Sequence, residues 1–290
     1  MSENHVIPLI LRSAGRSGST MLMQLLGTSE QIFMEREYPF EVRYLSYLHK
    51  LIYQIKQPCE NDDKWNPDSL FNQNITRVGA IPWRNVSILE QDRLATSVFR
   101  QAWKAFSQEL RIHSNNQNSD KIFYYAEKVV PIICFDVNAI TAAKNLFLFR
   151  DPRDEFLSIK SFNAKRNYLA FGWTNDDDDI SFANKLASQR KDFMRLISKI
   201  DMEDTRRHLV IYENMIRNPY AETQRLSRWL GVNLDWDNLS ANKEILAVHA
   251  TTTSLGQSIE RWKTELSKEI NQVFCDALGN ELQQLGYDLE

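Results

Sequence analysis

The chain has 290 residues, with 35 Lys or Arg against 38 Asp or Glu and a formal net charge of −3. Hydrophobic residues make up 43% of it, which is enough for a substantial core and excludes a disordered chain. A nearly neutral chain has no general field for nucleic acid or an anionic membrane, so we expect neither partner and expect any anion site to be local.

The cysteines and the first residues indicate a reducing compartment. The three cysteines are odd in number, far apart and in no metal-ligand spacing: Cys59, Cys134 and Cys275. The longest early apolar run, residues 6–11, is too short for a signal sequence or a membrane span. We therefore expect free thiols and a cytoplasmic location.

The first predicted elements are a strand over 6–11, a Gly/Ser-rich loop over 12–18 and a helix from residue 19. Gly15 and Gly18 allow positive φ and a close approach to a ligand. The free N–H groups at the start of the helix then favour an anion. The alternative is an ordinary strand-to-helix turn capped by one of the loop's serines.

This loop differs from that of common nucleoside-triphosphate sites. When Gly18-Ser19-Thr20 is aligned with the final Gly-Lys-Ser/Thr of that motif, Ser19 replaces the Lys and Ser13 replaces the first Gly. The positive charge of the loop lies at Arg16 instead.

Residues 32–40 form a short extended segment that ends in acids before Pro39. Ligands of open α/β sheets bind at the carboxyl ends of strands, which makes Glu37 our candidate general base. The alternative is a capping or surface acid.

The middle of the chain predicts a helix over 41–57, an irregular proline-containing segment over 58–88, a long helix over 89–113 and a strand over 121–131. Lys128 lies near the end of that strand. It is either a cation for the reacting group or a surface lysine.

A second polar element follows a buried strand over 145–149. The strand ends at Arg150, Pro152 lies in the turn, and the next helix brings Ser158 back alongside. An Arg can bind a phosphate through two N–H groups, and a Ser hydroxyl can add a contact. Alternatively the turn is structural, or Asp151 binds a metal as in kinases.

The two elements in combination resemble the PAPS-dependent sulfotransferases, of the compact cytosolic bacterial type. Residues 16–22 are similar to the family's 5′-phosphosulfate loop, and Arg150 with Ser158 are similar to its 3′-phosphate element, Arg-x-Pro-Arg/Lys-Asp followed by Ser at the same offset. The resemblance implies that the cofactor is held by Arg16, Ser17, Gly18, Ser19, Thr20, Met21, Arg150 and Ser158.

Further residues resemble the family less specifically. Glu37 follows Arg16 at the spacing of the base in the tyrosylprotein branch, and Lys128 resembles part of a Glu/Asp-Lys-x-Pro element. A helix over 180–200 precedes a predicted strand over 208–214, and a helix follows from 218 to about 230. The remaining candidate residues are Tyr212 for the adenosine, Ser258 and Arg261 in a Ser-x-x-Arg-Trp element for the phosphates, and His249 as a second candidate base.

Two of these assignments have structural alternatives, because Tyr212 could be a packed ring and His249 a structural histidine. The acidic block 176–179 likewise has two interpretations. It is either a solvated loop that caps the next helix or a feature that steers a cationic acceptor, such as a guanidinium alkaloid.

The sequence therefore predicts a single domain over 1–290, an α/β P-loop-type three-layer fold with a mostly parallel central sheet flanked by helices. By resemblance it transfers a sulfuryl group from PAPS to a hydroxyl or amine of a small-molecule acceptor, giving PAP. We expect no metal, because a sulfuryl group carries less charge than a phosphoryl group. The alternatives are a P-loop nucleotide or small-molecule kinase and a catalytically silent nucleotide-binding protein.

Overall fold

The computed structural model describes residues 6–36, 43–53, 90–114, 119, 121–131, 143–201, 203–242, 251–252 and 254–290. Contacts divide the chain into two compact units. One comprises Met1–Val6, Arg43–Lys121 and Phe135–Ala142, and the other comprises Ile7–Val42, Ile122–Cys134 and Ala143–Glu290. The single domain expected from the sequence stays a prediction.

The described part of the first unit contains the helices α2 (Tyr44–Tyr53) and α3 (Gln91–His113), where the sequence predicts helices. They pack through aromatic rings. The rings of Tyr44 and Phe106 stack with centroids 3.8 Å apart, and His49 meets Phe99 edge-on at 6.3 Å. The predicted irregular segment over 58–88 lies outside the described residues.

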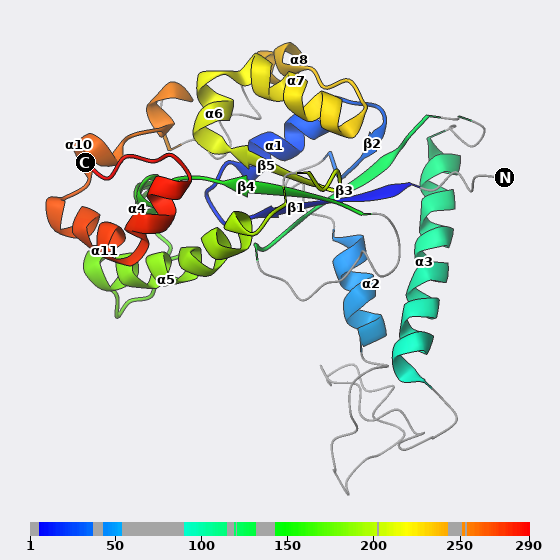
Figure 1. The fold of residues 1–290 in the computed structure, drawn as a ribbon, viewed down its shortest axis with the longest axis horizontal. Helices are drawn as coiled ribbons and strands as arrows, with labels where there is room; N and C mark the ends of the chain where they lie inside the picture. Colours follow the sequence, from blue (N-terminus) through cyan, green and yellow to red (C-terminus); the bar gives the residue numbers. More distant parts are fainter. Residues whose placement is uncertain are drawn as a thin grey trace, which may run out of the picture. The chain divides into compact units, whose positions relative to one another are not determined.

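The second unit is built on a five-stranded sheet in the order β2-β3-β1-β4-β5 (Figure 1). Every described strand pair is parallel. The strands are β1 (Ile7–Ser13), β2 (Ile32–Phe33), β3 (Tyr124–Val129), β4 (Lys144–Phe149) and β5 (Arg207–Ile211). Their apolar character fits strands that are buried on both faces.

Helices cover both faces of this sheet (Figure 1). On one face are α1 (Ser19–Leu26), α6 (Tyr212–Arg217), α7 (Pro219–Leu230) and α8 (Trp236–Ala241), whose apolar residues pack on Leu9, Leu11, Leu146 and Leu148. On the other are α4 (Pro152–Arg166), α5 (Asp179–Ser198) and α11 (Lys268–Gln284), which pack on Phe147 and Phe149. The expected three-layer α/β fold is confirmed.

The strand order places two loops together. β1 lies between β3 and β4, with Ser13 opposite Leu148, and Phe149 of β4 lies opposite Ile211 of β5. The chain leaves β1 toward one edge of the sheet and returns at β4 on the other side. The carboxyl ends of β1 and β4 therefore lie at the switch point of the strand order, which is where open α/β sheets bind ligands.

One strand end differs from the sequence prediction of a strand over 208–214. β5 ends at Ile211, and Tyr212 already begins helix α6. The turn brings the Glu213 carboxylate under the backbone N–H of Asp151, which donates to it at 3.0 Å. This long-range bond is invisible in the local apolar pattern.

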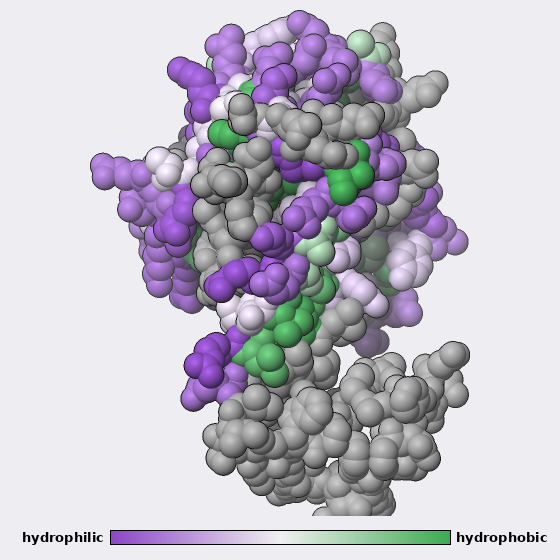
Figure 2. Space-filling view, turned by 90° about the vertical axis from the view of Figure 1, so that its right-hand side faces the viewer, coloured by the Kyte–Doolittle hydropathy of each residue, from purple (hydrophilic) through white to green (hydrophobic). Residues whose placement is uncertain are grey.

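The surface seen in Figure 2 carries many of the polar and charged residues of the chain. On the face drawn in Figure 2 the described residues are mostly hydrophilic, and hydrophobic ones form limited patches. Among the described helices, none has the length and apolar character needed to cross a membrane.

Candidate active site

The loop between β1 and α1 is shaped to present backbone amides. Gly18 has a φ of 89° and is the N-cap residue of α1, and Arg16 has a φ of 64°. No side chain caps the helix, and its first turn holds no acid. Such a helix start, with its free N–H groups of residues 19–21, suits an anionic ligand.

Close packing also limits the side chains that this loop can carry. A Cβ atom on Gly18 would lie 2.4 Å from the ring of Tyr212, and one on Gly15 would lie 2.4 Å from the ring of Phe171. Ser17 is completely buried, and its hydroxyl donates to the carbonyl of Ala14 at 2.8 Å. The Ser17 side chain therefore holds the loop together.

Two arginines meet at the ends of β1 and β4. Arg16 Nε donates to Ser158 Oγ at 3.2 Å, and Arg150 Nη1 donates to the carbonyl of Arg16 at 2.8 Å. Arg150 Nε is buried and has no hydrogen-bond partner among the described residues. A buried donor without a partner is costly, so this arrangement suits an added acceptor.

Burial and like charges both act on Arg16. Burial, together with the charges of Arg150 and Arg166 and against the opposing effect of Tyr212, lowers the pKa of its guanidinium to about 10. Arg16 also lies over the ring of Phe162, 4.8 Å from its centroid. An anion placed among these cations would favour their charged forms.

The segment 251–262, which includes η4 (Gly256–Ser258), adds contacts to this cluster. The hydroxyls of Tyr212 and Ser258 lie 2.8 Å apart, and Arg150 Nη2 donates to the carbonyl of Ser258 at 2.5 Å. Thr251 Oγ1 lies 3.4 Å from Ser158 Oγ. Of the sequence-predicted residues, the structure thus brings Arg16, Arg150, Ser158, Tyr212 and Ser258 together.

For the remaining candidate residues predicted from the sequence, the structure shows other contacts or gives no description. Arg261 precedes α10 (Trp262–Glu265) and donates to Glu265 at 2.7 and 2.9 Å and to Ser161 at 3.3 Å. Lys128 lies on β3 opposite Leu11, one residue before the strand ends. Glu37 and His249 lie outside the described residues.

The acidic block is engaged with neighbouring side chains. Asp178 caps α5 by accepting from the N–H of Ser181 at 2.8 Å, which confirms the capping interpretation for this residue. Asp177 pairs with Lys185 at 2.5 Å, which, with help from Thr174, lowers the pKa of Asp177 to about 2. Asp179 pairs with Lys160.

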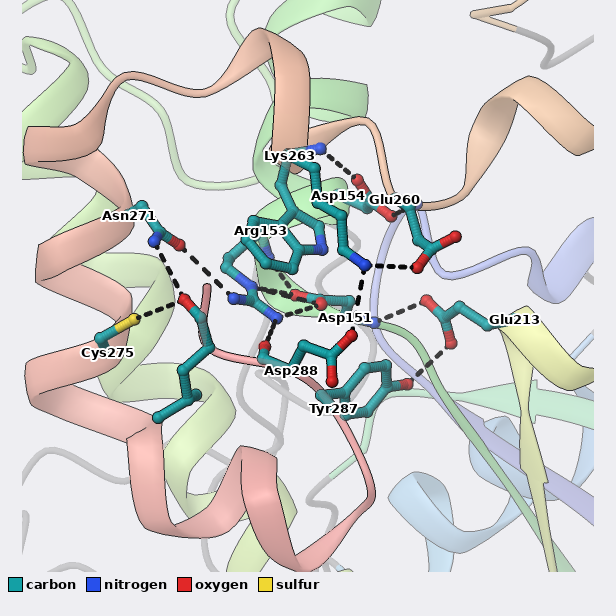
Figure 3. Close-up of polar contacts among 12 residues, drawn as sticks. Asp151, Arg153, Asp154, Glu213, Glu260, Lys263, Asn271, Cys275, Tyr287 and Asp288 are labelled. Carbon is teal, nitrogen blue, oxygen red and sulfur yellow. Dashed lines mark hydrogen bonds and ion pairs between the residues drawn. The ribbon is translucent and has the colours of Figure 1, made fainter.

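A group of buried charges beside the arginine cluster, drawn in Figure 3, was not predicted from the sequence. Arg153, Asp154 and Glu213 are each at most 3% exposed. Burial, with the charge of Asp151, raises the pKa of Asp154 to about 6 and that of Glu213 to about 7. Two adjacent opposite charges in the first turn of a helix, directly after a buried strand, were the signal available in the sequence.

We expect Glu213 to make the stability of the protein depend on pH. Its folded pKa of about 7 exceeds the ordinary 4.5, so between about pH 5 and 7 the folded state holds a proton that the unfolded state has lost. The free energy of unfolding should therefore fall as pH rises, by up to about 1.4 kcal/mol per pH unit.

Urea unfolding of the wild type and Glu213→Gln across this window measures the effect. Buried His208, with a pKa lowered from 6.5 to about 4, acts in the opposite direction between these two pH values, but it contributes to both proteins and cancels in the comparison. Glu203→Gln, at an exposed position, is the control. An equal slope in the wild type and Glu213→Gln would contradict the prediction.

Comparison with known proteins assigns the family. A family model described as the sulfotransferase family matches residues 8–238. The chain belongs to the sulfotransferase family. The enzyme class expected from the sequence is thereby confirmed. Comparison with curated proteins gives no significant match.

Solved structures are similar to this sulfotransferase. The sulfotransferase domain of the Synechococcus PCC 7002 olefin synthase matches with a TM-score of 0.50 and 16% identity, covering 100% of this chain and 98% of that one. The sulfotransferase domain from the curacin biosynthetic pathway gives 0.48 and 14%, covering 99% of each chain. These identities bear on the fold alone, and the roles of individual residues in this sulfotransferase remain proposals.

Proposed function

We propose that this sulfotransferase uses PAPS as its donor and a hydroxyl or amine of a small molecule as its acceptor. When bound, PAPS supplies an activated sulfuryl group, which passes to the acceptor oxygen or nitrogen and leaves PAP. The observation that carries the proposal is the convergence of Arg16 and Arg150 on the uncapped start of α1. One side of this cluster offers helix amides, and the other offers a buried N–H of Arg150 that has no partner among the residues that the structure describes.

The described residues fit a donor with two separate anionic groups. We assign the 5′-phosphosulfate to Arg16 and the amides of residues 18–21, since anions bind at helix starts. We assign the 3′-phosphate to Arg150 and Ser158, and the adenosine to Tyr212. Ser258 already contacts both Arg150 and Tyr212 and is proposed to close this side of the site.

Two further cations have proposed roles. Lys128 is proposed to stabilise charge on the leaving oxygen, as part of the electrostatic stabilisation of the reaction. Arg261 is proposed to contact the 3′-phosphate, and it would have to exchange its contacts with Glu265 for that phosphate. The buried Nη1 of Arg261, which has no hydrogen-bond partner in the described part of the chain, supports such a role.

The base is proposed to be Glu37, which would take the acceptor proton, with His249 as the alternative. Glu37→Gln should lower kcat at least tenfold and leave the Kd for PAP within twofold, because a positioned base acts on the reaction step. His249→Gln is the comparison. A loss of kcat in His249→Gln, with kcat unchanged in Glu37→Gln, would assign the base to His249. An unchanged kcat in both variants would contradict general-base catalysis by either residue.

For the acceptor, the finer proposal is a cationic natural product of the guanidinium alkaloid type. It rests on the charge of the acidic block alone, and Asp177, Asp178 and Asp179 already have protein partners. Rates with matched neutral phenols and cationic alkaloids test it. Equal rates would contradict it.

Isothermal titration with PAP, adenosine 5′-phosphosulfate and ATP, all in EDTA, tests the donor. We expect micromolar or tighter binding of PAP and at least tenfold weaker binding of the other two, which lack the 3′-phosphate. A preference for ATP or a requirement for Mg²⁺ would contradict the proposal and favour a kinase. Tight PAP binding without transfer to any acceptor tested would favour a silent nucleotide-binding protein.

A further inference from the structure

Arg153 is a completely buried arginine that joins three parts of the chain. It donates to both carboxylate oxygens of Asp151, at 3.0 and 2.8 Å, and Nη2 also donates to the carbonyl of Asp288 at 2.6 Å (Figure 3). Its guanidinium lies 3.4 Å from the centroid of the Trp262 ring. Arg153 thus connects the residue after Arg150 to the segments 254–262 and 285–290.

Asp154 holds the segment 254–262 directly. Its two oxygens accept from the backbone N–H groups of Glu260, at 2.7 Å, and Trp262, at 3.0 Å. Glu260 has a φ of 57°, a turn that directs both N–H groups to one carboxylate. The same segment supplies the Ser258 carbonyl to Arg150.

Tyr287 reaches the site from the segment 285–290. Its hydroxyl donates to Glu213 Oε2 at 2.7 Å, while Glu213 Oε1 accepts from the N–H of Asp151 (Figure 3). Glu213 directly follows Tyr212, whose ring centroid lies 4.6 Å from the guanidinium of Arg150. The Tyr287 hydroxyl is therefore linked, through Glu213, to both sides of Arg150.

We infer that Asp154 and Tyr287 are positioning residues for the 3′-phosphate site, acting on Arg150 through the segment 254–262 and through Glu213. The inference rests on the proposed function, which assigns the 3′-phosphate to Arg150. Neither residue touches the phosphate. Each fixes the groups that orient the guanidinium, and preorganised donors bind an anion more tightly than mobile ones.

The test compares Tyr287→Phe and Asp154→Asn with the wild type and with Asp192→Asn, an exposed aspartate on α5. Each variant is titrated with PAP and with adenosine 5′-phosphosulfate, which lacks the 3′-phosphate. We expect the Kd for PAP to rise at least fivefold in both variants and that for the phosphosulfate to stay within twofold. In steady-state assays KM for PAPS should rise at unchanged kcat.

The two ligands separate positioning from general destabilisation. Equal losses for both ligands would overturn the inference, because they indicate a structural role, and so would unchanged PAP binding in both variants. Asp154→Asn decides the outcome if Tyr287→Phe does not fold. Absence of PAP binding by the wild type would overturn the proposed function and this inference with it.

Discussion

Arg150→Ala is expected to weaken PAP binding by at least a hundredfold and to leave the binding of adenosine 5′-phosphosulfate within threefold. A hydrogen bond to a charged group contributes about 1.5–3 kcal/mol, and a guanidinium fork offers two of them. Losing both corresponds to about two or more orders of magnitude in Kd. The selectivity for PAP should therefore disappear.

Arg150→Lys is the matched control, since it keeps the charge and loses the planar fork. We expect PAP affinity between those of the wild type and Arg150→Ala. Thermal unfolding of both variants is needed because Arg150 also faces the buried carboxylates of Asp154 and Glu155. A folded Arg150→Ala that binds PAP within threefold of the wild type would remove Arg150 from the proposed site.

The second large effect is expected for Gly18→Ala. A positive φ costs a residue with a Cβ roughly 1–2 kcal/mol, and here the new methyl group would also lie 2.4 Å from the Tyr212 ring. Tyr212 would have to move, which breaks its contacts with Ser258 and Arg150. We expect kcat/KM for PAPS to fall at least a hundredfold.

Gly231→Ala separates the cost of a positive φ from the effect of a steric clash with Tyr212. Gly231 has a φ of 70°, but apart from its neighbours along the chain no atom of the described residues lies within 4 Å of the Cβ that would be added. This variant should lose about 1–2 kcal/mol of stability and keep its kcat/KM for PAPS. If Gly18→Ala is no less active than Gly231→Ala, the contact between the loop and Tyr212 is unimportant for function.

The sequence predicts those parts of the site that are local in the chain. An apolar strand followed by a Gly/Ser loop and a helix is a local pattern, and it locates Arg16 and Gly18 correctly on the turn between β1 and α1. Arg150 likewise follows a buried strand, as predicted. These elements need no tertiary information.

Residues whose environment comes from distant segments were harder to predict. Arg261 lies next to a helical turn, so Glu265, four residues on, competes for its guanidinium. The pairing of Asp154 with residues 260 and 262 depends on a fold-level contact across more than 100 positions. The adjacent charges at 153 and 154 were a signal in the sequence, but their burial, like that of Glu213, comes from contacts with distant segments.

The central position of β1 also bears on how the protein folds. Ile7 pairs with Tyr124, and Leu9 pairs with Lys144, so the first strand of the sheet finds both neighbours only after more than 100 further residues. Pairing strands at such separations costs loop-closure entropy before it gains contact energy, which slows folding. During synthesis on the ribosome, the β1 segment and the following loop that contains Arg16 therefore remain unpaired until β3 and β4 emerge.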